Sequence, residues 1–190
     1  MAGLAAEWIW HDPFEDCSYE VQNGLAVYAA NGRDLWFLNL SAPRVLRKAS
    51  GDLIVQTVCG PVTDAIPPIG GLLFWKDEAN YLHLDRGMFG RREITLVGCL
   101  DNEDILIGRG WLYDDAERVF LRLERVGDQV NAYCSADGKG WYTVGRAGFP
   151  VQDPIEVGLH AIGDIDRTVY HGAHPEGTAI RFGSFQLWGI

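Results

Sequence analysis

The sequence of 190 residues has little positive charge. Lysine and arginine number 16 against 26 aspartate and glutamate residues, which gives a formal net charge of −10. A chain this acidic is repelled by nucleic acid backbones and by anionic membrane surfaces. The densest basic segments, 44–48 and 91–92, are too short to form a basic stripe. We therefore expect no nucleic acid partner and no membrane partner.

Signals for export or membrane insertion are also missing. Residues 1–10 lack the positive charge and long apolar core of a secretory signal, and no apolar run approaches the about 20 residues of a membrane span. The few cysteines, Cys17, Cys59, Cys99 and Cys134, form no Cys-x-x-Cys pair, and the last three lie in apolar runs. We expect buried free thiols and no disulfide, in a reduced, cytoplasmic protein.

The composition is that of a globular domain rich in turns and strands. Hydrophobic residues make up 47% and charged residues 22%, whereas aromatic residues reach 12% and glycine numbers 23. These values exclude disordered and coiled-coil chains and favour strands over helices. The length fits one domain over residues 1–190.

Segments typical of strands alternate with turn sequences along the whole chain. Strands are expected near Leu25–Ala29, Leu35–Asn39, Leu53–Val58, Gly71–Lys76, Tyr81–Arg86, Glu93–Leu100, Trp111–Tyr113, Val119–Val126, Gln129–Ser135, Trp141–Ala147, Ile155–Ile162 and Ile180–Trp188. A further strand is expected around Trp8 and Trp10, and one short helical turn near Ala42–Lys48. Many short strands separated by turns predict an all-β fold, a two-sheet antiparallel β-sandwich.

Alternation in four of these strands assigns side chains to faces. Apolar residues occupy one parity in the segments 81–86, 119–126, 129–135 and 155–162. The opposite parity carries His83, Arg122, Glu124, Tyr133 and His160. If the four strands join one sheet, these five side chains share its non-core face. We expect this face to be the working surface, rimmed by a long loop over residues 163–177 that includes His171.

The chemistry of that face favours a sugar-like ligand. Aromatic rings stack on the apolar faces of pyranoses, and planar polar side chains bind hydroxyl groups. We therefore expect a carbohydrate or another small polyhydroxylated ligand. The alternative is a solvated polar face in which Arg122 and Glu124 form cross-strand pairs.

Several longer stretches resemble a known family. They are GLLFWKDEANYLHLDRG (71–87), VFLRLERVGD (119–128), YCSADGKGW (133–141), VGLH (157–160) and IRFGSFQLW (180–188). They resemble a bacterial family of concanavalin A-like domains of unknown function, related to the C-terminal sandwich of some bacterial β-xylosidases. The resemblance covers residues 8–188. It implies a jelly roll of two antiparallel sheets, one of them concave, and places the expected ligand on the concave face. It implies no catalytic residues.

Two other functions stay open. A glycosidase needs two carboxylates about 5–10 Å apart. Glu124 supplies one, and Asp85, Glu93 or Glu156 could supply the second, but the sequence does not select among them. An enzyme acting on a glycoside or small metabolite, with His83, Glu124 or His160 as acid or base, is thus the first alternative. A protein-interaction module is the second.

No motif predicts a metal or a cofactor. His171 and His174 lie three residues apart beside acidic residues, but this spacing matches no established metal site. The acidic clusters at 101–104 and 114–115 lack the spacing of an EF-hand loop. The turn at 135–141 is interpreted as a fold device in which Gly138 or Gly140 takes a positive φ. We expect a fold that needs neither metal nor disulfides.

Overall fold

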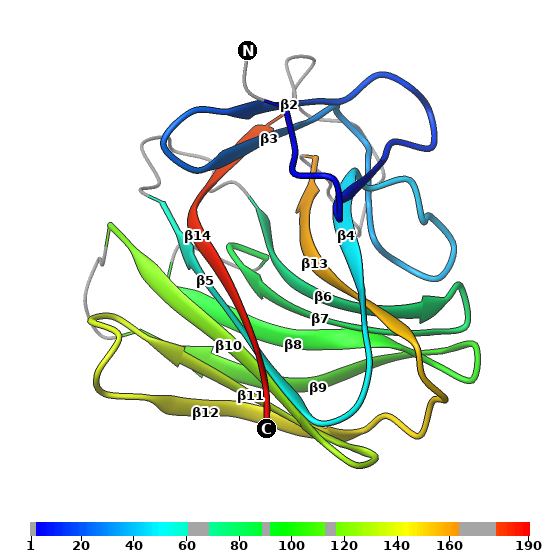
Figure 1. The fold of residues 1–190 in the computed structure, drawn as a ribbon, viewed down its shortest axis with the longest axis vertical. Coiled ribbons are helices and arrows are strands. Elements are labelled where there is room, and N and C mark those ends of the chain that lie inside the picture. Colours follow the sequence, from blue (N-terminus) through cyan, green and yellow to red (C-terminus); the bar gives the residue numbers. More distant parts are fainter. Residues whose placement is uncertain (1–2, 61–68, 89–91, 113–116, 164–177) are drawn as a thin grey trace.

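The computed structural model describes residues 3–60, 69–88, 92–112, 117–163 and 178–190. In these residues it contains fourteen β-strands and no helix, and therefore no helix able to cross a membrane. The strands form two antiparallel seven-stranded sheets that lie one over the other (Figure 1). The expected two-sheet β-sandwich is thereby confirmed.

The two sheets draw strands from the whole length of the chain. Sheet A has the order β12 (Tyr142–Gly148), β11 (Gln129–Ser135), β10 (Val119–Val126), β5 (Leu53–Cys59), β14 (Thr178–Gly189), β3 (Leu25–Ala29) and β2 (Ser18–Val21). Sheet B has the order β1 (Ile9–His11), β4 (Arg44–Ala49), β13 (Ile155–Ile162), β6 (Ile69–Asp77), β7 (Asn80–Arg86), β8 (Glu93–Leu100) and β9 (Glu103–Trp111).

The main core lies between the sheets and follows the alternation of the strands. Leu121 and Leu123 of β10 face Phe74 of β6 and Leu82 and Leu84 of β7, and all five are fully buried. Burying each such side chain stabilises the fold by about 1.5–3 kcal/mol. Cys59, Cys99 and Cys134 are buried and all four cysteines are free, as expected. Gly138 has a φ of 74°, which confirms the glycine turn after β11.

Four segments differ from expectation, and one of them is strand β2, where no strand was expected. The segment expected to form a helical turn is strand β4, because it pairs on both sides, with β1 and with β13. The expected strand at Leu35–Asn39 is a loop with one bridge between Trp36 and Asn39. Strand β9 was missed apart from its last residue, Trp111, since its glycines and acidic residues are poor strand formers.

Sheet B is covered on its outer face as well. Leu73 and Trp75 alternate with the core residues of β6 and therefore point away from the main core. They form a second apolar cluster, which we call the outer cluster, with Leu35, Ala42, Leu46, Tyr81, Cys99 and Ile162. The loop between β3 and β4, residues 30–43, supplies two of these side chains. This loop is therefore a partial third layer over sheet B.

An inward-pointing arginine lies at each end of the main core. Arg125 points into the core from β10 and is 5% exposed. Its Nη1 lies 2.5 Å from Asp153 Oδ1, and its Nη2 donates to the Val151 carbonyl at 2.9 Å. Arg86, 4% exposed, donates from Nη1 to the Gly60 and Glu117 carbonyls. The two arginines lie at opposite ends of β5, and they satisfy backbone carbonyls there.

Candidate functional site

The structure divides the sequence-predicted site residues between two surfaces. Arg122 and Glu124 of β10 and Tyr133 of β11 lie on the outer face of sheet A, whereas His83 of β7 and His160 of β13 lie on the outer face of sheet B. The expectation that all five share one face is therefore wrong. Alternation shows which side chains point away from the core, but a sandwich has two outer faces, and strand pairing decides between them. His171 lies outside the described residues.

On sheet A, the register places four polar side chains in one row. Tyr133 is opposite Arg122, Arg122 is opposite Gln56, and Gln56 is opposite Gln186. Arg122 donates from Nε and Nη2 to Gln56 Oε1 at 3.1 and 2.8 Å, and Gln56 Nε2 donates to Gln186 Oε1 at 3.4 Å. We call this set, with Glu124 and Trp141, the Arg122 platform.

Arg122 is the centre of the platform. Its guanidinium carbon lies 3.9 Å from the centre of the Trp141 ring, and its Nη1 lies 3.5 Å from Glu124 Oε1. The side chains of Arg122 and Glu124 are 27% and 24% exposed. Stacking on an indole and hydrogen bonding in the guanidinium plane both restrict the arginine to one orientation. The platform is thus both ordered and accessible to a ligand.

Tyr133 completes the platform beside Glu124. Burial, together with the adjacent Glu124 carboxylate, raises the pKa of Tyr133. The phenol is therefore neutral near pH 7 and can donate as well as accept a hydrogen bond. Gln56, Gln186 and Trp141 were not among the sequence-predicted site residues. The alternation of β5 indicates that Gln56 points outward, but only the register shows that it lies next to Arg122.

On sheet B, Asp85 lies between the two histidines. His83 Nδ1 is 2.7 Å from Asp85 Oδ2, and His160 Nε2 is 2.8 Å from Asp85 Oδ1. All three side chains are at most 2% exposed. The register sets Gly71 of β6 between His160 and Asp85, so the two side chains meet across a position without a side chain.

The electrostatics of this His83–Asp85–His160 cluster follow from its burial. Burial opposes ionisation of Asp85, but the adjacent imidazoles outweigh it and hold the pKa of the carboxyl below its ordinary value. Burial lowers the pKa of His160, although Asp85 opposes this shift. Asp85 is therefore an anion near neutral pH beside a neutral His160.

Aromatic contacts connect the His83–Asp85–His160 cluster to the outer cluster. The Trp75 and Tyr81 rings stack with centroids 5.2 Å apart, Tyr81 stacks on His83 at 5.9 Å, and Arg44 lies 4.4 Å from the Trp75 ring centre. The three donor atoms of the cluster lie within 4.8 Å of one another, a separation compatible with one divalent cation. His83 is hydrogen-bonded to Asp85, and His160 lies within ion-pair distance of the same carboxylate, so the cluster connects β7 to β13 as a buried polar network.

Comparison with known proteins supports the fold. No family model matches the sequence, and a search of curated proteins gave no significant match. Among solved structures, a functionally unknown protein from Saccharomyces cerevisiae aligns with a TM-score of 0.76 and 17% identity over 97% of both chains. The yeast structure shows that this fold is not confined to bacterial proteins.

Two further similar structures are of a GH43 protein and a carbohydrate-binding module. The GH43 protein BlXynB from Bacillus licheniformis aligns with a TM-score of 0.76 and 16% identity, over 99% of this chain and 38% of that one. This chain therefore spans well under half the length of that GH43 protein. The carbohydrate-binding module CBM66 from Bacillus subtilis aligns with a TM-score of 0.61 and 14% identity, over 95% and 94% of the two chains. At these identities, the likenesses show a shared β-sandwich.

Proposed function

We propose that the protein binds a carbohydrate or another polyhydroxylated ligand through the Arg122 platform. The observation that carries this proposal is the arrangement of Arg122, which stacks on Trp141 and donates twice to Gln56 on an accessible sheet face. The fold shared with a carbohydrate-binding module supports the same class of function.

The platform has the chemistry that a sugar requires. Glu124 and Gln186 offer acceptors and Arg122 offers donors, whereas Gln56 Oε1 already accepts two hydrogen bonds from Arg122. These mutual hydrogen bonds fix the directions of the side chains before a ligand arrives. Binding then costs little side-chain conformational entropy, because the side chains are already ordered, and this raises the affinity for a weakly interacting ligand. Trp188, 42% exposed, lies in the neighbouring row of the same face and offers an additional ring.

Binding is favoured over glycoside hydrolysis at this platform. Hydrolysis by the common mechanisms needs two carboxylates that flank the scissile bond, and Glu124 is the one carboxylate of the Arg122 platform. An enzyme acting on a glycoside or small metabolite and a protein-interaction module are the two alternatives to this binding function.

A glycan array followed by calorimetry tests the proposal. The wild type should bind at least one class of saccharide, and Arg122→Gln, Trp141→Ala and Glu124→Gln should each weaken binding by tenfold or more, since each removes a contact worth about 1.4 kcal/mol. Arg146→Gln is the matched control, because Arg146 also lies on the outer face of sheet A and donates to a glutamine, Gln129, at 3.1 Å.

The control variant should bind within about twofold of the wild type. Absence of binding to any saccharide, or unchanged affinity in Arg122→Gln and Trp141→Ala, would show that the platform is an ordinary polar surface.

A further inference from the structure

We propose a second site, which binds an amphiphile with a short apolar chain and an anionic head group. It lies where β14 separates from the hairpin of β2 and β3. The site uses none of the platform residues and goes beyond the carbohydrate proposal.

A notch in sheet A creates this site. Strand β14 pairs with β3 only as far as Phe182, which lies opposite Leu25, the first residue of β3. A register shift between Phe182 and Phe185 then interrupts its pairing with β5. Gly24 has a φ of 125°, and a Cβ there would lie 2.3 Å from the Phe182 carbonyl oxygen, so glycine lets the hairpin turn approach β14 closely.

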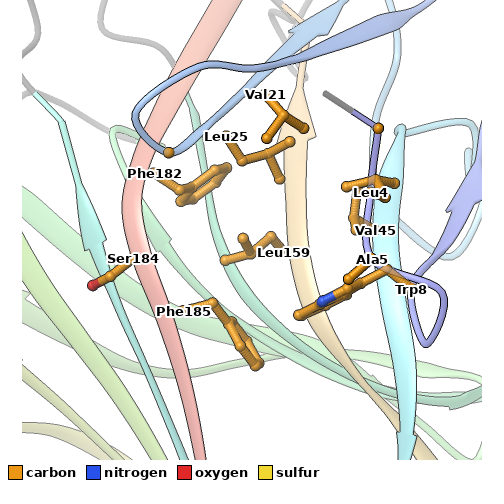
Figure 2. A pocket seen from close by; sticks show the side chains of 12 residues that line it. Leu4, Ala5, Trp8, Val21, Leu25, Val45, Leu159, Phe182, Ser184 and Phe185 are labelled. Atoms are coloured by element: carbon orange, nitrogen blue, oxygen red, sulfur yellow. The ribbon is translucent and has the colours of Figure 1, made fainter. Parts of the chain in front are cut away.

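An apolar cavity of about 250 Å³ extends from the notch into the space between the sheets. Figure 2 shows Leu25, Leu159, Phe182 and Phe185 around it, with Ser184 pointing away. The N-terminal segment closes the far side through Leu4, Ala5 and Trp8, and the Trp8 ring contacts Phe185 edge-on at 4.8 Å. The cavity thus has walls from both sheets and from the N-terminal segment.

A second cavity of about 520 Å³, whose lining is mixed and more polar than that of the first, lies on the outside of the same notch. Val58 and Phe120 line it, together with the exposed residues Arg118 and Arg181. Neither arginine makes an ion pair or a side-chain hydrogen bond with another described residue, although the chain has a net charge of −10. The two cavities share Gly24, Leu25, Phe182 and Ser184, so they meet at the notch.

The two cavities define complementary halves of a ligand. Two arginines that line one cavity, with no acidic partner among the described residues, suit a carboxylate or a phosphate. The apolar cavity has room for about eight groups the size of a water molecule or a methylene, at about 30 Å³ each. A linear chain of about eight carbons therefore fits the volume of the apolar cavity, and an anionic end suits the arginines of the second, wider cavity.

Chain length gives a quantitative expectation. Burial of each additional methylene strengthens binding about fourfold, so butanoate, hexanoate and octanoate should differ by about 15-fold per step. The gain should stop once the chain exceeds the cavity. Octanoate and octyl phosphate should both bind and together show which head group is preferred.

Calorimetric titration of the whole chain with these probes tests the site. Octanoate should bind with a stoichiometry of one, and acetate and 1-octanol should bind at least tenfold more weakly, because each lacks one half of the ligand. Arg118→Gln combined with Arg181→Gln should weaken octanoate at least tenfold and leave 1-octanol unchanged. Ala5→Phe, which fills the apolar cavity from the exposed N-terminal segment, should weaken both.

Arg146→Gln again serves as the control and should bind octanoate like the wild type. The proposal fails if octanoate does not bind, if its affinity is independent of chain length, or if the arginine and Ala5 variants bind it unchanged. Saccharide binding should be unaffected in these variants, so failure here is distinguishable from failure of the Arg122 platform.

Discussion

The ion pair between Arg125 and Asp153 offers a sharp test of how the core is closed. The Arg125 side chain is 6% exposed and that of Asp153 is 36% exposed. Asp153→Asn removes the negative charge, while its amide oxygen can still accept the hydrogen bond from the Gly51 amide, which is 2.7 Å long in the wild type. The substitution therefore removes both the charge of Asp153 and its acceptor for Arg125, because the Asn Nδ2 donor then faces Arg125 Nη1.

The expected loss is about 2 kcal/mol of unfolding free energy. Removing the partner of a buried charge costs about 3–5 kcal/mol. Arg125 keeps its hydrogen bond to Val151, however, and solvent reaches Asp153, so the cost falls to that of a hydrogen bond to a charged group, about 1.5–3 kcal/mol. For a chain of this size, 2 kcal/mol lowers the Tm by about 4–8 °C.

Urea unfolding followed by circular dichroism measures this loss. Asp16→Asn is the matched control, because Asp16 also lies 2.5 Å from an arginine, Arg33, but that arginine side chain is 20% exposed. The control should lose less than about 1 kcal/mol. Exposed ion pairs contribute about 0–1 kcal/mol. If Asp153→Asn lowers the unfolding free energy by less than about 0.5 kcal/mol, or by no more than Asp16→Asn does, the ion pair does not close the core.

The same pair predicts a pH dependence with a defined sign. The hydrogen bond from Arg125 is the main cause that holds the pKa of Asp153 below its ordinary value. The stabilisation is therefore complete above the ordinary aspartate pKa of about 3.9 and is lost as the pH falls toward the lower folded-state pKa. The difference in stability between the wild type and Asp153→Asn should shrink below about pH 4.

Two further predictions concern buried groups. His160→Ala should lower the unfolding free energy by about 3–5 kcal/mol, measured in urea, because it leaves the buried Asp85 carboxylate with one imidazole partner; a loss below 1 kcal/mol would show that the cluster is not a structural network. Burial raises the pKa of Cys59 to about 12 and that of Cys134 to about 11, so iodoacetamide at pH 8 should modify them only after unfolding. Mass spectrometry of the native protein detects any modification that precedes unfolding. A reductant should leave the Tm unchanged, since the cysteines are free.

Sequence patterns predicted the sandwich because most strands have clear boundaries and alternation. The inward positions are apolar and buried up to Leu123 in β10 and up to Cys134 in β11. Strand β4 escaped prediction because its identity depends on pairing with β13, more than 100 residues away, rather than on local preference.

The candidate site was only partly predictable for a related reason. Alternation correctly placed Arg122 and Tyr133 on an outer face, but it could not show that β7 and β13 belong to the other sheet. Nor could it show that His83 and His160 are buried, because their cover includes distant chain segments. The notch at Gly24 arises from strand lengths and a register shift, neither of which has a pattern in the sequence.

The outer cluster gives the two sheets different tolerance of change. Strand β7 is buried on both faces from Tyr81 to Arg86, whereas β10 keeps Arg122 and Glu124 half-exposed beside its buried residues. A substitution almost anywhere in β7 must therefore satisfy packing on one side or the other, and its amides should exchange with solvent deuterium only through extensive unfolding. Every second position of β10 is released from that constraint. The outer face of β10 is thus a surface on which new binding specificities can be selected, in nature or in the laboratory, while β7 preserves the fold.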